Sequence, residues 1–104
     1  MEEREVELAV EETINVIEES VNKDIESNLQ KKAAIERIKS MNRLEKLLVN
    51  KQIASKFLQM NGLDHLEKYL YDLPDGSKPS SILKTKLLTL LRSLKVDSTH
   101  IKNN

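Results

Sequence analysis

Six aliphatic residues near the start of the chain recur at the spacing of an α-helix. The intervals between them are four, four, three, four and four residues, and the set is Val6, Val10, Ile14, Ile17, Val21 and Ile25. An α-helix turns once every ~3.6 residues, so this spacing puts all six side chains on one face. Acids and asparagines fill the other faces. The sequence therefore predicts a long amphipathic helix over residues 3–27, the longest in the chain.

Shorter helical patterns follow in the middle of the chain. We expect a helix from about Leu29 to Ser40, with Asn28 as its candidate cap. Leucines mark a further short helix over 44–48, with Asn50 near its end, and apolar residues mark another over 53–58.

The second half of the chain carries clearer turn signals. Gly62 stands where a left-handed residue ends a helix, and a short helix is expected from there to about Leu73. The run Pro74-Asp75-Gly76-Ser77 is a turn by composition. Pro79 and the two serines after it predict the start of a helix over 81–94, which has a leucine stripe.

Taken together, these patterns predict an all-α fold. We expect five to six helices in a compact bundle or in superhelical stacked hairpins, with Asp97 or Ser98 starting a last short helix. One domain over 1–104 is expected, in which 1–50 forms the N-terminal hairpin helices and 51–104 begins a second bundle.

Composition excludes several classes of function. The chain has no cysteine, which removes disulfides, thiol catalysis and cysteine-based zinc sites. The N-terminus is acidic, without the apolar region of a secretory signal, and no apolar run approaches the ~18–20 residues of a membrane span. No membrane partner is expected.

No constellation of residues indicates catalysis. His65 and His100 stand apart and lack metal-ligand spacing, so we expect no metal and no cofactor. Carboxylate pairs abound in residues 2–19, but they lie on a face expected to be solvated, and acid–base catalysis needs burial to shift a pKa. The sequence predicts a protein that is not an enzyme.

Charge is unevenly distributed along a chain whose net charge is zero. Residues 1–28 hold ten acids and two bases, a net charge of −8, whereas residues 29–104 carry +8. Two interpretations stay open: a solvated acidic helix face, or an acidic segment that packs on the basic surface that follows it or competes for it. The basic stretch Lys84–Lys95 also permits an alternative function, a nucleic-acid-binding or histone-binding helical domain.

Residues 8–104 resemble the conserved core of the Spn/Iws ("interacts with Spt") transcription elongation factors. The most specific motif is Leu73-Pro74-Asp75-Gly76-Ser77, followed one residue later by Pro79 and then by an aliphatic helix that ends in a short loop. Upstream, Asn28-Leu29-Gln30-Lys31-Lys32-Ala33-Ala34 is similar to the first hairpin of the family.

The resemblance implies an all-α superhelical core with a domain of the transcription factor S-II N-terminal type. It also implies a nuclear, non-enzymatic scaffold of the RNA polymerase II elongation complex that binds a disordered segment of the histone chaperone Spt-six. In the family, the stretch matching Ile101–Asn104 continues into further helices, so the chain resembles a core truncated at its C-terminus. We expect self-association through that end, and weak contact with DNA or histones under the alternative function.

Related domains bind ligand motifs in a pocket built from two interhelical loops. The matching loops here contain Met60 and Asn61, and Leu94, Lys95 and Val96. The resemblance therefore implies that Leu94 and Val96 accept an aromatic anchor. Arg92 and Lys95 would then face the acids that flank such a motif. The alternative for the two apolar residues is an ordinary place in the core, and for the two cations a solvated face.

Overall fold

The computed structural model describes the backbone of residues 1–102 and the side chains of residues 1–94. It contains five α-helices and one short 3-10 helix, and no strand is present among the described residues. In chain order these are α1 (Glu3–Leu29), α2 (Glu36–Leu48), α3 (Lys51–Gln59), α4 (Gly62–Glu67), the 3-10 helix η1 (Lys68–Leu70) and α5 (Ser81–Lys102). The all-α prediction is confirmed, and α1 is the longest helix, as expected.

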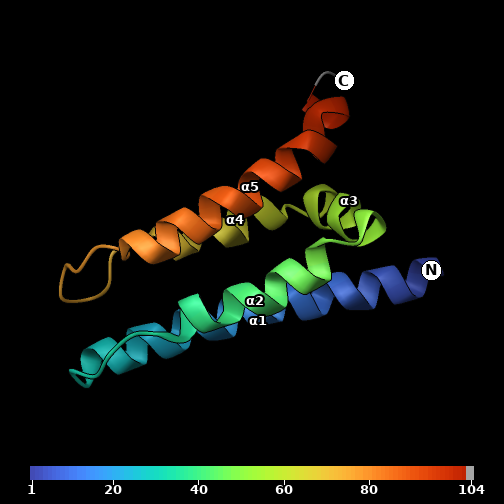
Figure 1. The fold of residues 1–104 in the computed structure, drawn as a ribbon. Coiled ribbons are helices and arrows are strands. Elements are labelled where there is room, and N and C mark those ends of the chain that lie inside the picture. The colour runs from blue at the N-terminus through green and yellow to red at the C-terminus, as the bar shows by residue number, and fades with distance from the viewer. Residues whose placement is uncertain (103–104) are drawn as a thin grey trace.

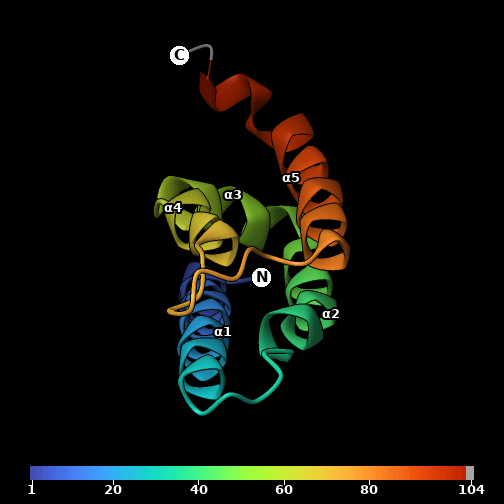
Figure 2. The same cartoon turned by 90° about the vertical axis from the view of Figure 1, so that its left-hand side faces the viewer.

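The helices are arranged as two stacked pairs. Helices α1 and α2 run antiparallel side by side, and α3 crosses at one end to connect them with α4 and α5 (Figures 1 and 2). Helix α4 packs on α1 and α3, whereas α5 packs on α2 and α3. Helices α4 and α5 share α3 as a neighbour, but α4 also rests on α1 and α5 on α2, so the two lie apart in Figure 2.

The apolar stripe of α1 faces the core as predicted. Val6, Val10, Ile17 and Val21 are buried, and Ile14 and Ile25 are half-buried at the edge of the core. The remaining core comes mainly from the later helices. Its larger members are Met41, Leu44, Leu48, Ile53, Phe57, Leu66, Tyr69, Leu83, Leu87, Leu90 and Leu94.

The prediction of helices over 29–40 and 44–48 is wrong. Helix α1 continues to Leu29, Lys31 takes a left-handed φ of 59° to turn the chain, and α2 is one continuous helix from Glu36 to Leu48. Asn28 lies inside α1 and caps no helix; its Oδ1 accepts a hydrogen bond from the Asp75 backbone N–H at 3.1 Å. The carboxylate that caps α2 comes instead from Asp24, twelve residues upstream of Glu36.

The joints on either side of α3 use asparagines. Asn50 caps α3, since its side chain accepts hydrogen bonds from the backbone of Gln52 and Ile53. At the other end Asn61, not Gly62, takes the left-handed conformation, with a φ of 62°. Gly62 is buried as the first residue of α4, and a Cβ there would overlap the ring of Phe57. The glycine is required by this close approach and not by a left-handed turn.

The turn and helix predicted after Leu73 are present, but the helix is longer than expected. Gly76 has a φ of 86°, and Ser80 Oγ accepts a hydrogen bond from the Leu83 N–H at 3.2 Å to cap α5. The predicted loop at Leu94–Val96 is wrong, because α5 continues through these positions to Lys102. No glycine or proline interrupts this stretch, so nothing local ends the helix.

Candidate functional site

Ion pairs from α1 show where its acidic residues go. Most acids of α1 face solvent, but Glu12 pairs with Arg43 of α2, Glu18 with Lys68 of η1, and Asp24 with Arg37 of α2. The acidic segment therefore packs in part on basic residues that follow it, which supports the second interpretation of the charge asymmetry. Asp24 differs from the other acids of α1, because its side chain is fully buried.

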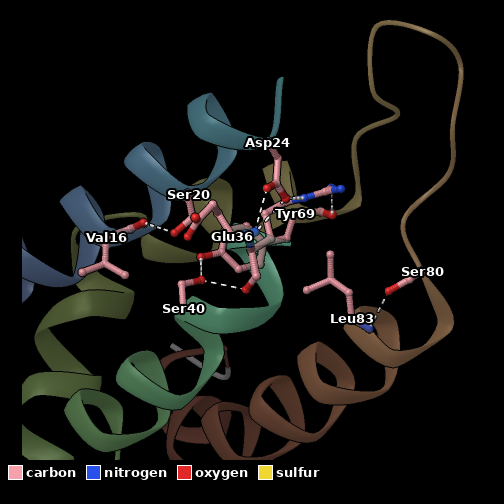
Figure 3. Close-up of polar contacts among 9 residues, drawn as sticks. Val16, Ser20, Asp24, Glu36, Ser40, Tyr69, Ser80 and Leu83 are labelled. Carbon is pink, nitrogen blue, oxygen red and sulfur yellow. Dashed lines mark hydrogen bonds and ion pairs between the residues drawn. The ribbon is translucent and has the colours of Figure 1, made fainter. Parts of the chain in front are cut away.

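The buried charges form a polar junction between α1, α2 and η1, drawn in Figure 3. The Asp24 carboxylate accepts hydrogen bonds from the backbone N–H groups of Glu36 and Arg37, at 2.8 and 3.2 Å, and from Arg37 Nε at 2.5 Å. Arg37 also donates to the carbonyl oxygen of Tyr69 at 2.9 Å. The hydroxyls of Tyr69 and Ser40 lie 2.5 Å apart.

The groups of this junction contact one another and not the solvent. Its charged groups are almost wholly withdrawn from solvent, with Arg37 4% exposed and Asp24 0%. Burial raises the pKa of the Tyr69 hydroxyl above its usual value, although hydrogen bonding with Ser40 opposes that change. The polar groups are occupied by one another, and a buried ion pair with its hydrogen bonds satisfied favours one helix arrangement over others.

One open feature among the described residues is an apolar groove between α4 and α5, which we term the α4–α5 groove. Its lining comes from one side of each element: Leu63, Leu66, Glu67, Leu70, Leu87 and Leu91. The groove encloses about 120 Å³ and is almost entirely apolar. Leu66 and Leu87 are fully buried and form its floor, whereas Leu63 and Leu70 are about 40% exposed and form one wall.

Polar contacts beside the groove attach one of its walls to α1. Lys68 Nζ donates to Glu18 Oε1 at 2.6 Å, which ties η1 to α1. His65 Nδ1 lies 3.7 Å from the other oxygen of Glu18, and neither atom has a hydrogen-bond partner. Since α5 is attached to α2 and α3 instead, the leucines between α4 and α5 are left without a covering element among the described residues.

The residues that the sequence predicts at a ligand pocket are divided between the surface and the core, and none of them lines the groove itself. Met60 and Asn61 end α3 and are exposed, two residues before Leu63 begins the groove wall. Arg92 is exposed on α5 and directly follows Leu91. Leu94 is only 2% exposed and lies in the core, while Lys95 and Val96 lie outside the residues whose side chains are described.

Sequence reasoning missed the groove leucines themselves. Leu63, Leu66 and Leu70 were assigned to a short helix, and Leu87 and Leu91 to the stripe of the last helix, with no indication that the two would face one another. The sequence did contain one signal. Leu88 and Leu91 make the apolar side of α5 wider than the stripe that packs on a single neighbouring helix.

The described side chains do not form a dense basic surface on α5. Lys84 and Arg92 are exposed and Lys86 is half-buried, and the three point in different directions around the helix. Among the described residues, no helix is long and apolar enough to cross a membrane, and no three metal-ligating side chains gather at one point.

Known proteins similar to this chain bear the names IWS1 and SPN1. Protein IWS1 homolog 1 of Arabidopsis thaliana is 33% identical over 93 residues, which cover 89% of this chain and 18% of that relative. Transcription factor SPN1 of Saccharomyces cerevisiae is 29% identical over 86 residues, covering 83% of the chain and 21% of the relative. Transcription factor IWS1 of Candida albicans is 28% identical over 82 residues, covering 79% and 20%.

The chain thus spans about a fifth of the length of the curated relatives that it matches. No protein-family model and no solved structure matches it. The similarity nevertheless covers most of the chain, and it confirms the resemblance of this chain to the Spn/Iws family.

Proposed function

We propose that this chain is a non-enzymatic interaction module of the nuclear RNA polymerase II elongation machinery. In this proposal it binds a disordered segment of an Spt-six-type histone chaperone. Resemblance to the Spn/Iws family supports the role in transcription elongation. The absence of any catalytic constellation among the described residues is consistent with a scaffold.

The single observation that carries the proposal is the α4–α5 groove. A disordered segment that folds on binding loses conformational entropy, so it needs a place where one or two apolar side chains are strongly desolvated. The groove offers a dry floor at Leu66 and Leu87 and accessible walls at Leu63 and Leu70. We propose that an apolar or aromatic anchor of the partner occupies it.

The surroundings of the groove suit the rest of such a segment. Lys84 is exposed two helical turns before Leu91 on the same side of α5, and Arg92 follows Leu91. These cations would attract acids that flank the anchor. Met60 and Asn61 extend the proposed surface beyond the α4 end. The proposal also includes Lys95, Val96 and Leu94, of which Leu94 lies in the core.

Calorimetric titration with a synthetic peptide of the Spt-six disordered segment tests the proposal. Leu63→Asp places a charge on the groove wall and should weaken binding about tenfold or more. The matched control is Val49→Asp, which makes the same kind of change at an aliphatic side chain that is 78% exposed and outside the groove. Equal affinities for the two variants, with circular dichroism showing both folded, would exclude the groove.

The salt dependence of the same titration distinguishes the proposed function from the alternative function. Anchoring by a buried apolar side chain should weaken only modestly as salt rises, whereas binding to duplex DNA through lysines falls steeply. The net charge of +8 over residues 29–104 is what favours a nucleic-acid-binding or histone-binding domain. Steep salt dependence with a DNA duplex, together with no binding of the peptide, would favour that alternative.

A further inference from the structure

A second cleft, distinct from the α4–α5 groove, lies between two segments that are far apart in the sequence. The loop after α1 and the turn before α5 lie at the same end of the molecule (Figures 1 and 2). The cleft between them encloses about 730 Å³ and is lined by Asn28, Leu29, Lys31, Lys32, Ala33, Pro74 and Asp75. We term it the loop cleft, and it shares no residue with the groove.

The loop cleft is held open by a defined set of hydrogen bonds. Asn28 Oδ1 accepts from the Asp75 backbone N–H at 3.1 Å, which ties the turn to the end of α1. Lys32 N–H donates to the Ser27 carbonyl oxygen at 2.8 Å, which fixes the path of the chain after α1. A cleft whose two sides are connected in this way does not need to assemble when a ligand binds.

The charges in the loop cleft are not balanced. Asp75 is its one acid, and Oδ1 of that side chain accepts hydrogen bonds from the backbone N–H of Ser77 at 2.8 Å and from the Ser77 hydroxyl. These hydrogen bonds from Ser77, helped by Asn28, lower the pKa of the Asp75 carboxyl. The carboxylate therefore stays ionised, but two lysines outnumber it in the lining, and Lys31 and Lys32 are exposed and make no ion pair with any described side chain.

An apolar surface lies beside these two lysines. Leu29 is 67% exposed at the end of α1, and Ala33 and Pro74 are exposed next to it in the same lining. An exposed leucine in a cleft can be covered by one apolar side chain of a ligand, which removes the apolar surface of both from water. Nucleic acid would instead favour aromatic or guanidinium groups for stacking, and this lining contains neither.

We propose that the loop cleft is a second interaction site, which binds an acidic segment of a partner protein. One apolar side chain of that segment rests against Leu29 and Pro74, and its flanking carboxylates lie at Lys31 and Lys32. The observation that carries this inference is charge complementarity: two cations without an ion pair among the described side chains stand beside an apolar surface and outnumber the one acid of the cleft. The inference does not depend on the proposed function of the groove.

Fluorescence anisotropy with a labelled synthetic peptide tests the loop cleft. The probe carries aspartates on both sides of one central leucine, and its control has asparagines in place of the aspartates. The double variant Lys31→Asn, Lys32→Gln removes both cations, and asparagine tolerates the left-handed backbone at position 31. It should weaken binding of the acidic probe about three- to tenfold. Lys46→Gln, at an exposed lysine of α2 outside the cleft, should leave binding unchanged.

Three results would overturn the inference. The first is equal binding of the aspartate and asparagine probes. The second is an effect of Lys46→Gln as large as that of the double variant, which would mean that only net charge matters. The third is competition by a DNA duplex that removes the acidic probe from the wild-type protein but not from the double variant, which would make the cleft a phosphate-binding surface. Leu63→Asp serves as a further control, because a defect in the groove should not change binding of this probe.

Discussion

The polar junction and the α4–α5 groove both lie between packed helices, but their side chains differ in solvent exposure. At the junction, Asp24 and Arg37 are buried and use their hydrogen-bonding groups on each other and on nearby backbone. In the groove, Leu63 and Leu70 stay partly open although their neighbours Leu66 and Leu87 are buried.

The difference separates what holds the fold from what is available to a partner. A buried charge network that loses one member leaves an uncompensated charge, so the junction tolerates little change. Replacing a leucine that is about 40% exposed removes less buried apolar area than replacing a fully buried one, so it should cost less stability. Stability should therefore depend on the junction, and binding on the groove.

The largest expected effect comes from breaking the ion pair of the junction. Asp24→Ala leaves the buried Arg37 guanidinium unpaired and removes the cap of α2, so the free energy of unfolding should fall by about 3–5 kcal/mol. Urea denaturation followed by circular dichroism measures it. Leu63→Asp should change the same quantity by about 1 kcal/mol or less. A smaller loss for Asp24→Ala than for Leu63→Asp would contradict the comparison.

Gly62, at the start of α4, should be the position where a substitution has the next largest effect on stability. Gly62→Ala forces a Cβ against the ring of Phe57, and the expected cost is about 1–3 kcal/mol. Thermal unfolding checks this, with Gly76→Ala as a contrasting variant in which nothing crowds the new Cβ and only the left-handed φ is strained. Combining Gly62→Ala with Phe57→Leu should cost less than the sum of the two single changes; strict additivity would show that the ring is not the obstacle.

A gentler change at the junction should have a moderate effect. Tyr69→Phe removes one hydroxyl, while Ser40 keeps its hydrogen bond to the Arg37 carbonyl oxygen. The expected loss of unfolding free energy is about 0.5–1.5 kcal/mol, the usual range for one hydrogen bond. Denaturant titration at neutral pH gives this value. A loss as large as that of Asp24→Ala would place the tyrosine hydroxyl, and not the ion pair, at the centre of the junction.

The smallest effect concerns the exposed turn before α5. Hydrogen bonds from Ser77 lower the pKa of Asp75 below its ordinary 3.8, so the ionised form favours the folded turn. This contribution is present above pH ~4 and is lost as the pH falls through the lowered pKa. Carboxyl NMR shifts should show Asp75 titrating below 3.8 in the native protein and closer to that value in Ser77→Ala. An unchanged midpoint in the variant would mean that Ser77 does not hold the carboxylate.

What the sequence predicts well is local, and what it predicts poorly depends on distant contacts. The stripe from Val6 to Ile25 defines α1, because helical spacing and apolar character lie within one segment. The start of α2 could not be found in the same way, since its cap is Asp24 on another helix. That carboxylate belongs by composition to an acidic face, yet tertiary packing buries it.

The candidate site divides along the same line. The sequence pointed to exposed positions near the groove, Met60, Asn61 and Arg92, but also to Leu94, which lies in the core. Helical periodicity identifies leucines that face inward as a group. Periodicity does not reveal which of these leucines another helix covers. The covering depends on the tertiary arrangement, in which α4 rests on α1 and α5 on α2.

The most direct test of the account is an NMR titration of the labelled protein with the Spt-six peptide. We predict that amides of Leu63–Leu70 and of Leu87–Leu91 shift together and saturate, while those of Asp24 and Arg37 in the junction keep their positions. Binding would then occur at the open apolar groove and leave the polar junction intact. Saturable shifts confined to the acidic outer face of α1, or shifts of the junction amides without any in the groove, would contradict the account.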